Sequence, residues 1–437
     1  MLLHLLDGRF DVDPATIDLE GFARDGRVYA YFGIFPALLR LPMMVFADLR
    51  TAHLERISCW LAMLIGGAAQ AWAVFTVLRG TGRGGRLLLP PLLLIAVLSG
   101  PGVMLGTSQQ IYNEAMLWAW ALASVFVAVA LRGLFAWRLF PGADLCAMAA
   151  AAGATLLARP TTGIGLYAAL AAIGVCLLCR EGWRAAFTPR LLAPFVLAGA
   201  LAAAAGLVNH GRWGNPLTVA DPRLQLMNAV FPDRLARLDK YGLFHIDRAP
   251  LLLMYYLLPL WTVNWHGSYL WQDRINELYD GLELPPSTPF LTDPLTIALA
   301  VAGLWIWRFR PPGPRGAAAL CLLAGLAVPP ALMLTAWYGA FRYRAEYAPL
   351  LFAAGCLGAR LCARPLTDAA DSTRRHARRW IWTACGVQLA AAFLFGILQS
   401  WSPLGPFYDV LAKQNASGLG ALYLQILKVH YWDFMRH

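Results

Sequence analysis

Residues 163–208 read GIGLYAALAAIGVCLLCREGWRAAFTPRLLAPFVLAGALAAAAGLV, and this stretch decides the fold. Two uncharged apolar runs, 163–179 and 191–208, flank a short link, 180–190, that contains three arginines. An apolar run of about 20 residues is long enough to cross a bilayer as a helix. Short loops rich in arginine mark the cytoplasmic side of a membrane protein. The stretch therefore predicts a membrane-spanning helical hairpin whose basic link faces the cytoplasm.

The composition of the whole chain has the same character. Of its 437 residues, 59% are apolar and 14% are charged, and its mean hydropathy is +0.54. Soluble globular proteins contain roughly 45–50% apolar and about 25% charged residues. These values exclude a soluble enzyme, a disordered chain and a fibrous protein, and they predict an all-α polytopic membrane protein. The formal net charge of +11 comes almost entirely from arginine. In a membrane protein this excess indicates basic cytoplasmic loops, so we expect no nucleic-acid partner.

Hydropathy and charge together predict the topology. Ten apolar ranges are expected to span the membrane, namely 54–78, 87–105, 114–131, 145–158, 163–179, 191–208, 290–307, 317–338, 346–361 and 380–400. Five short connections, 79–86, 132–144, 180–190, 308–316 and 360–379, carry 17 arginines and 4 acidic residues. The remaining connections and the two terminal segments together carry 18 basic and 19 acidic residues over a much greater length. The five short connections are therefore predicted to be cytoplasmic and the other set extracytoplasmic.

The predicted organisation has five parts. They are an external first loop with interfacial helices (1–53), transmembrane helices (54–208), a large external loop with an interfacial helix at 249–265 (209–289), further transmembrane helices (290–400) and an external tail (401–437). The topology places the first loop outside the cytoplasm with no span before it, and Met1–Leu6 looks like the last turn of a helix. We therefore expect that a first helix is missing or truncated and that the full protein has eleven spans.

The sequence shows no convincing motif for a nucleotide, a cofactor or a metal. GxxxxGK[ST] does not occur, and the glycine-rich stretch 80–86, whose letters fit GxGxxG, lacks the strand–turn–helix setting that a phosphate-binding loop needs, so we expect no nucleotide-driven chemistry and no cofactor. The eight cysteines all lie within or at the ends of apolar runs. Cys176 and Cys179 form a CxxC without a second pair or histidine partners, so we predict neither a zinc nor a redox site. The histidines are scattered and show no HExxH spacing, so we expect no metal site.

The first external loop is dense in carboxylates, which are Asp7, Asp11, Asp13, Asp18, Glu20 and Asp25. An aromatic segment that includes Tyr29 and Tyr31 follows. One interpretation is a solvated acidic loop before an interfacial helix, because tyrosine is common at the level of the lipid headgroups. The other is a catalytic carboxylate beside aromatic residues that contact the substrate, because general-base catalysis needs a carboxylate near the substrate hydroxyl.

Two further features lie at the predicted external ends of spans. Glu114 opens the third span, where it either stabilises the first turn of the helix or lines the rim of a cavity. Arg159 lies in the tight turn 158–163, on the side opposite the basic connections, so the orientation rule does not explain it. Its side chain either extends to the membrane surface or binds a lipid phosphate.

Arg342 and Arg344 occupy a second short external link, 338–349. Arginine binds phosphate through two parallel hydrogen bonds and does not lose its charge. Several arginines at one membrane depth would form a site for an anionic headgroup, because an unpaired charge there is otherwise costly. Glu346 in the same link is the alternative, structural partner for one of them.

Five motifs in this order resemble the C-type membrane glycosyltransferases (GT-C superfamily). The likeness is greatest to the bacterial relatives of dolichyl-phosphate-mannose–protein mannosyltransferases and of aminoarabinose transferases. It covers about residues 5–360. The motifs are Gly8–Phe10 with Asp25–Pro42, Tyr112–Glu114, Arg159–Thr161, Asn209–Pro216 and Arg342–Pro349.

The resemblance implies an inverting transferase of the bacterial inner membrane with its active site on the extracytoplasmic face. Its donor would be a sugar on a polyprenyl-phosphate carrier, and its acceptor a lipid, glycan or protein. An acidic residue of the first loop would be the base, so Asp7, Asp11 and Asp13 are the candidates, with Glu20 weaker. Arg159, Arg342 and Arg344 would hold the carrier phosphate. Tyr29, Tyr31, Glu114 and Glu346 complete the predicted substrate-binding set.

Two other functions fit the same composition. A transporter or lipid flippase commonly has repeated halves and broken helices at the bilayer midplane, whereas the polar residues here gather at the external rim. A non-catalytic scaffold is the third hypothesis, because a missing first helix would remove the anchor of the catalytic loop.

Overall fold

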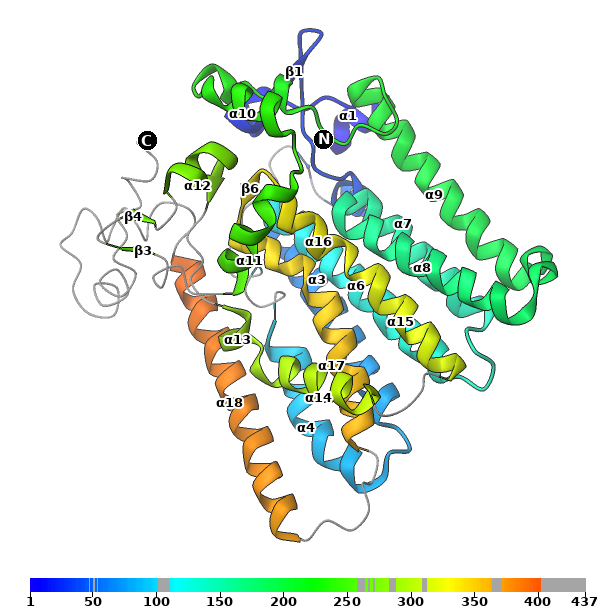
Figure 1. The fold of residues 1–437 in the computed structure, drawn as a ribbon. Coiled ribbons are helices and arrows are strands. Elements are labelled where there is room, and N and C mark those ends of the chain that lie inside the picture. Colours follow the sequence, from blue (N-terminus) through cyan, green and yellow to red (C-terminus); the bar gives the residue numbers. More distant parts are fainter. Residues whose placement is uncertain are drawn as a thin grey trace.

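A computed structural model describes residues 1–46, 48–49, 52, 54–100, 105, 111–257, 264–265, 268–269, 272–282, 288–308, 313–363 and 371–401. Most of these residues are helical, and the strands form three two-stranded sheets. Figure 1 shows a bundle of long helices with short elements gathered at its upper end. The described part of the chain therefore has the architecture of an all-α membrane protein.

Among the described residues, five helical segments are long and apolar enough to cross a membrane. They are α3 (Glu55–Leu78), α6 (Ile111–Phe135), α8 (Pro160–Glu181), α9 (Pro189–Trp213) and the consecutive α15 (Pro314–Leu326) and α16 (Val328–Thr335). The other bundle helices are α4 (Gly82–Leu98), α7 (Gly142–Ala158), α14 (Pro294–Arg308), α17 (Ala348–Ala363) and α18 (Asp371–Trp401). A helix thus lies in each of the ten ranges predicted to span, because a segment in lipid must satisfy its backbone hydrogen bonds internally.

Several helix boundaries differ from the prediction, and two of these differences have a local cause in the sequence. The helix predicted over 87–105 begins at Gly82 and ends at Leu98, just before Gly100, whose φ of +86° is incompatible with a continuing helix. The span predicted over 317–338 is divided into α15 and α16. The second piece begins at Val328 with Pro329 and Pro330 in its first turn, and prolines have no backbone N–H to continue the hydrogen bonds of the first piece.

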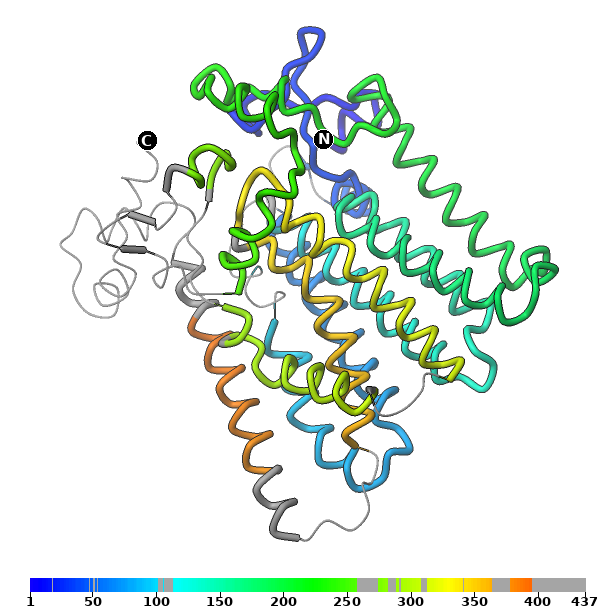
Figure 2. Tube along the Cα trace, viewed as in Figure 1, coloured from blue at the N-terminus to red at the C-terminus, as the bar shows by residue number. Residues whose placement is uncertain are grey.

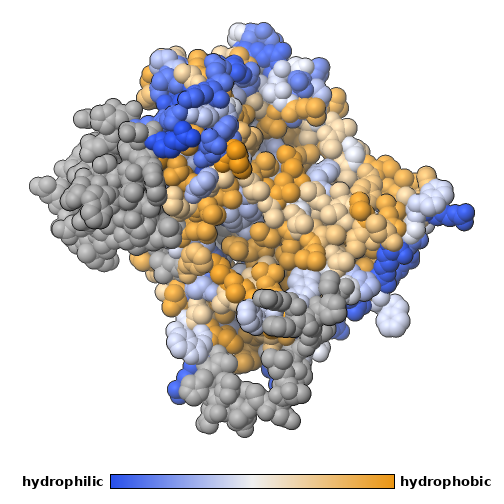
Figure 3. All heavy atoms as spheres, viewed as in Figure 1, coloured by the Kyte–Doolittle hydropathy of each residue, from blue (hydrophilic) through white to orange (hydrophobic). Residues whose placement is uncertain are grey.

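The outer surface of the bundle is apolar. Exposed large side chains include Trp60 and Leu64 of α3 and Leu207 of α9, each more than 60% exposed. Figure 3 shows apolar residues across the middle of one face, with hydrophilic residues above and at the lower right. An apolar surface of this extent is unfavourable in water, and it is typical of a protein embedded in a membrane.

The helix ends that flank the five basic connections lie on one side of the bundle. They include the end of α8, the start of α9 and the start of α18, which are at the lower and right-hand side in Figure 1. The short elements of the first and large loops lie at the opposite, upper side. We call the upper side the distal end of the bundle. The helix ends that flank the basic connections and the described elements of the two external loops are therefore separated in space, as the charge pattern requires.

The first loop is more structured than predicted. Its elements are α1 (Leu2–Leu6), η1 (Pro14–Thr16), η2 (Asp18–Glu20), β1 (Phe22–Arg24), β2 (Arg27–Tyr29), α2 (Phe35–Leu38) and η3 (Leu41–Val45). The two strands form an antiparallel hairpin around Asp25 and Gly26, both with positive φ. An Asp-Gly pair between strand-forming residues is a strong hairpin signal, so the sequence contained this information.

The large loop folds over the distal end. Its elements are η5 (Pro222–Leu224), η6 (Leu226–Ala229), α10 (Asp233–Tyr241), η7 (Ile246–Arg248), α11 (Ala249–Leu257), β3 (Asn264–Trp265), β4 (Ser268–Tyr269), α12 (Gln272–Leu278), β5 (Gly281–Leu282) and α13 (Pro289–Thr292). β5 pairs in parallel with β6 (Tyr338–Gly339), just before η9 (Phe341–Glu346). This pairing attaches the loop to the link that carries Arg342.

The predicted interfacial helix and the predicted tail are covered only in part. Of the helix predicted over 249–265, α11 accounts for the first part, residues 258–263 lie outside the described residues, and 264–265 form a strand. That part of the prediction was wrong, because Asn264–Trp265 pairs with a second short strand. The predicted tail begins at Trp401, the last residue of α18, and its remainder, 402–437, lies outside the described residues.

Candidate functional site

The first loop is fixed to the ends of three bundle helices. A Cβ on Gly33 would lie 2.0 Å from the carbonyl oxygen of Leu157 and 2.3 Å from that of Ala158, so only glycine fits against the end of α7. Arg212 of α9 donates from Nη1 to the carbonyl of Phe32 at 2.8 Å. Figure 2 shows the first loop, in blue, beside the green elements of the large loop, although the two loops are far apart in sequence. The close approach brings Tyr31 to the start of α8.

We expect Gly33→Ala to displace the first loop and to lower both stability and function. The added methyl group meets backbone atoms of Leu157 and Ala158, which cannot rotate away. Overpacking of this kind costs about 1–3 kcal/mol. Thermal unfolding in detergent, followed by tryptophan fluorescence, measures the effect.

Gly199→Ala is the matched control for this substitution. Gly199 lies in α9 with open space around its Cβ position. In a helix, alanine is more favourable than glycine by about 1 kcal/mol, so this variant should unfold at the same or a higher temperature. Equal unfolding temperatures for both variants would contradict the close packing at Gly33.

Arg159 and Glu346 form a buried ion pair between the α7–α8 turn and η9. Nε of Arg159 donates to Oε1 of Glu346. The hydroxyl groups of Thr161 and Thr162 donate to the same carboxylate at 2.7 and 2.5 Å. Glu346 is 1% exposed. Three donors thus satisfy this carboxylate, and most of the charge of Arg159 is compensated within the protein.

Tyr343 lies between two of the predicted arginines. The guanidinium carbon of Arg159 is 5.2 Å from the centre of its ring, and that of Arg342 is 5.7 Å away. Both distances are within the range of a cation–π interaction. Burial raises the pKa of the nearby Tyr31 hydroxyl, and this pKa also responds to the charges of Arg159 and Arg342. The structure therefore gathers Tyr31, Arg159, Arg342 and Tyr343 into one group, which we call the aromatic–arginine cluster.

Arg342 also lines a cleft beside this cluster. The cleft has a volume of about 730 Å³ including its open mouth. Arg344, which is 9% exposed, shares the wall and donates from Nη2 to the hydroxyl of Thr292 at 2.7 Å. That hydroxyl donates to Oδ2 of Asp293, also at 2.7 Å. Much of the remaining wall is apolar and includes Ile95, Leu105, Leu351 and Phe352.

Uncharged polar side chains line another part of the cleft. Nε2 of Gln388 on α18 donates to Ser99 at 3.4 Å and to Thr296 at 3.2 Å. Gln70 of α3 also lines the cleft and donates to Ser124 at 3.3 Å. The cleft thus combines two arginines, the carboxyl group of Asp293, a group of amides and hydroxyls, and an apolar wall.

Two predicted substrate-binding residues lie elsewhere. Oε2 of Glu114 accepts from Nη2 of Arg40 at 2.7 Å, and Glu114 is 5% exposed. Tyr29 is 8% exposed, and its ring centre lies 6.0 Å from that of Trp213. Within the described part of the chain, neither residue lines the cleft. The structure places both in packed surroundings.

The three predicted catalytic aspartates gather around His4 and Arg9, away from the cleft lining that the structure describes. Both carboxylate oxygens of Asp11 accept from Arg9, at 3.0 and 2.5 Å, and this contact lowers the pKa of Asp11 to about 2. The carboxylate of Asp13 is 72% exposed and lies 3.6 Å from His4. Asp7 is exposed.

Several residues of the cleft were missed in the sequence. Asp293 is an acidic residue within a predicted span, and Gln70 and Gln388 are amides within spans. Polar residues at such positions commonly mark functional sites, so this signal was present. The contact of Arg344 with Thr292 has no local signature, because the two residues belong to segments brought together only by the fold.

Within the described residues, no group of three or more His, Cys, Asp or Glu side chains is placed to hold a metal ion. Comparisons of the chain with protein-family models, with curated proteins and with solved structures gave no significant match. The geometry of the cleft and the cluster therefore carries what we infer about function.

Proposed function

We propose that the chain is a glycosyltransferase with a GT-C-like fold and ten membrane spans. It would move a sugar, with inversion, from a polyprenyl-phosphate carrier to a lipid, glycan or protein acceptor on the extracytoplasmic face of the bacterial inner membrane. The observation that carries this proposal is the placement of Arg342 and Arg344 on an apolar-walled cleft at the distal end of the bundle.

The composition of the cleft suits an anionic lipid. Arginine at the distal end is not explained by the charge rule that accounts for the basic connections. A guanidinium group binds phosphate through parallel hydrogen bonds, and apolar side chains such as Leu351 and Phe352 suit the adjoining isoprenoid chain. A donor bound in this way would place its sugar toward the cluster of Tyr31 and Tyr343.

The same arrangement suits direct displacement at the anomeric carbon. As the bond from this carbon to the phosphate oxygen breaks, negative charge increases on the phosphate. Arg342 and Arg344 would stabilise that charge, as preorganised cations do for developing anions. Arg159 contributes less in this proposal because Glu346 already compensates its charge.

Sugar transfer from radiolabelled polyprenyl-phosphate sugars to acceptors in isolated membranes tests the proposal. We expect one donor of the panel to support transfer by the wild type and Arg342→Ala to lower the rate about 100-fold or more, the usual effect of removing one group that stabilises a developing anion. Arg27→Ala is the matched control, because Arg27 is exposed on the hairpin. Transfer that is unaffected by Arg342→Ala, or no transfer from any donor by inserted wild-type protein, would contradict the proposal.

A lipid flippase is the second candidate, and the polar cleft residues Gln70, Ser99 and Gln388 favour it. A headgroup that moves through the bilayer needs hydrogen-bonding partners below the surface. In this case the protein would move a fluorescent polyprenyl-phosphate sugar between leaflets of a vesicle without releasing the sugar. Cleavage of the donor in the transfer experiment separates the two functions.

A further inference from the structure

A neutral hydroxyl group holds Arg344 on the wall of the cleft. The side chain of Arg344 is buried in η9, and its Nη2 donates to Oγ1 of Thr292 at 2.7 Å. Thr292 is itself buried and is the last residue of α13. The five N–H groups of a guanidinium lie in one rigid plane, so a contact at Nη2 restricts the orientation of the whole group. The position of Thr292 therefore influences how Arg344 faces the cleft.

The carboxyl group of Asp293 orients this hydroxyl. Oγ1 of Thr292 donates to Oδ2 of Asp293 at 2.7 Å, whereas the carbonyl oxygen of Thr288 lies farther away, at 3.2 Å. A hydroxyl has one proton to donate and two lone pairs that accept. Because Asp293 accepts the proton, a lone pair of Thr292 is directed to Arg344. Hydrogen bonds that are connected in this way polarise one another in a buried chain. We call Arg344, Thr292 and Asp293 the arginine relay.

The backbone holds Asp293 at a break between two helices. Its amide donates to the carbonyl of Pro289 at 2.7 Å, and Pro294 begins α14 directly after it. A residue before proline has few allowed backbone conformations, so the carboxyl group extends from a restricted point of the chain. Asp293 lines the same cleft as Arg342 and Arg344. The relay therefore belongs to the wall on which the proposed function depends.

The relay differs from the ion pair of Arg159. Nε of Arg159 donates directly to the buried carboxylate of Glu346, so these two charges are in contact. In the relay, the hydroxyl of Thr292 lies between the guanidinium and the carboxylate. The energy of two charges falls as their distance grows, so Arg344 keeps more of its attraction for a further anion than Arg159 does. Arg344 is thus held in place without being fully compensated.

We propose that Thr292 and Asp293 are positioning residues for the carrier phosphate. This inference rests on the proposed function, which supplies the phosphate. Thr292 holds the guanidinium of Arg344 on the cleft wall, and Asp293 fixes the direction in which the hydroxyl of Thr292 donates. Both residues act through Arg344 and not on the reacting atoms. The relay orders Arg344 before the donor binds, and groups that are already ordered bind a ligand more tightly because less entropy is lost.

Binding of farnesyl phosphate to the purified protein in detergent tests the inference, with farnesol as the uncharged ligand of the same chain length. Isothermal titration calorimetry measures both. Thr292→Val removes the hydroxyl and keeps the shape of the side chain. We expect it to weaken binding of farnesyl phosphate at least about tenfold, the usual effect of losing one hydrogen bond to a charged group, and to leave farnesol binding unchanged. Thr292→Ser keeps the hydroxyl and should bind both ligands as the wild type does.

Thr288→Val is the matched control for Thr292→Val. Thr288 is also buried, lies one turn earlier, and makes no capping hydrogen bond with its side chain. It contacts Thr292 through its backbone carbonyl, which the substitution keeps. This variant should bind farnesyl phosphate as the wild type does. In an Arg344→Gln background, whose binding is already weak, Thr292→Val should have no further effect, because residues that act as one unit are not additive.

Two substitutions of Asp293 separate orientation from charge. Asp293→Asn keeps an oxygen that accepts from Thr292 and removes the negative charge, so it should bind farnesyl phosphate at least as tightly as the wild type. Asp293→Ala removes the acceptor as well. The hydroxyl of Thr292 then donates to the carbonyl of Thr288, and binding should weaken. A carboxylate that acted only through its charge would repel the phosphate, and both substitutions would tighten binding.

Three results would overturn the inference. They are wild-type binding of farnesyl phosphate by Thr292→Val, tighter binding by Asp293→Ala, and additive losses in the double variant with Arg344→Gln. Sugar transfer is measured separately in membranes. A wild type that transfers sugar while Thr292→Val binds normally contradicts this inference alone. A wild type whose binding of farnesyl phosphate depends on Thr292, but which transfers no sugar from any donor, contradicts the proposed transfer alone.

Discussion

Glu346→Ala is expected to lower the free energy of unfolding by about 3–5 kcal/mol, the usual cost of removing one partner of a buried ion pair. The substitution leaves Arg159, whose side chain is 17% exposed, without its anion. It also removes the acceptor for the hydroxyl groups of Thr161 and Thr162. Chemical or thermal unfolding in detergent measures the loss. Asp239→Ala is the matched control, because its pair with Arg223 is exposed on both sides and such pairs contribute about 0–1 kcal/mol.

A double substitution shows whether the loss comes from the unpaired charge. Arg159→Met with Glu346→Leu replaces the ion pair by apolar groups of similar size, and such replacements are often neutral or stabilising. We therefore expect the double variant to be more stable than Glu346→Ala alone. A Glu346→Ala protein that unfolds like the wild type would show that the pair does not stabilise the fold. Loss of sugar transfer in a folded double variant would indicate that Arg159 also contacts the donor.

The positions of the helices followed from the sequence because lipid imposes them. An apolar run in a bilayer must be helical to satisfy its backbone groups, so a helix lies in each predicted range. The exceptions are local. Proline divides the range 317–338, and Gly100 follows the early end of α4. The hairpin at Asp25–Gly26 was missed because the aromatic residues around it were interpreted as an interfacial helix.

The partners of the charged residues could be predicted only in part. Glu346 was expected to pair with one of the three external arginines, but the sequence alone did not indicate which one. Its partner is Arg159, 187 positions earlier in the chain. Likewise, Gln225 and Glu20 are 205 positions apart. Such contacts depend on how the large loop folds over the distal end, and no local pattern in the sequence encodes that path.

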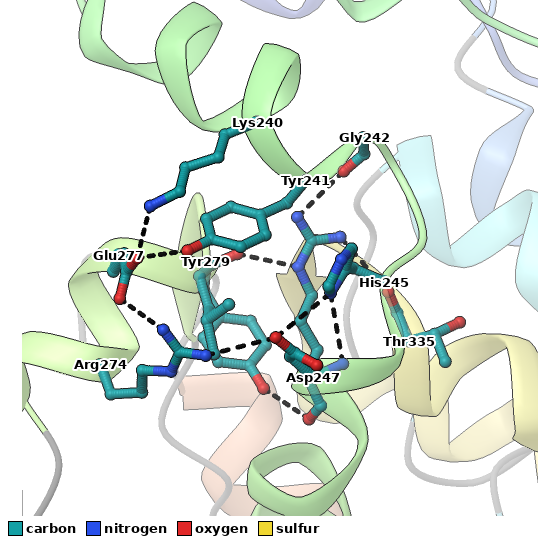
Figure 4. A network of polar contacts seen from close by, with 11 residues as sticks. Lys240, Tyr241, Gly242, His245, Asp247, Arg274, Glu277, Tyr279 and Thr335 are labelled. Atoms are coloured by element: carbon teal, nitrogen blue, oxygen red, sulfur yellow. Dashed lines mark hydrogen bonds and ion pairs between the residues drawn. The ribbon is translucent and has the colours of Figure 1, made fainter.

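Arg248 holds this loop in place, and Arg248→Ala is expected to destabilise it strongly. The side chain is 0% exposed and donates to four main-chain carbonyl groups. Its partners are Leu278 at 2.8 Å, Gly242 at 2.9 Å, Leu243 at 3.0 Å and Thr335 at 3.3 Å. Figure 4 shows Gly242 at the upper right of this network and Thr335 at its lower right. One guanidinium group thus joins the end of α10, the end of α12 and the end of α16.

Removal of this side chain takes a donor from four carbonyl groups, of which, among the described residues, only that of Thr335 keeps another donor, the backbone N–H of His245 at 2.8 Å. Each unsatisfied buried group costs about 1–3 kcal/mol before the surroundings relax, so we expect a total loss of at least about 3 kcal/mol. Arg248→Lys restores a charge but not the planar fork of donors, and should fall between the alanine variant and the wild type. Unfolding in detergent measures both, and limited proteolysis shows whether the loop opens first.

Arg274→Ala is the control for Arg248→Ala because Arg274 belongs to the same network but lies at its surface (Figure 4). Its contacts are with Glu277 at 2.6 Å and Asp247 at 3.3 Å, and its side chain is 46% exposed. Exposed ion pairs contribute about 0–1 kcal/mol, so this variant should keep a stable loop. Equal stability of the two variants would show that Arg248 does not hold the loop. A loop that opens only in Arg248→Ala, with loss of sugar transfer, would instead connect this arginine to the cleft, because Thr335 begins the segment that carries Arg342 and Arg344.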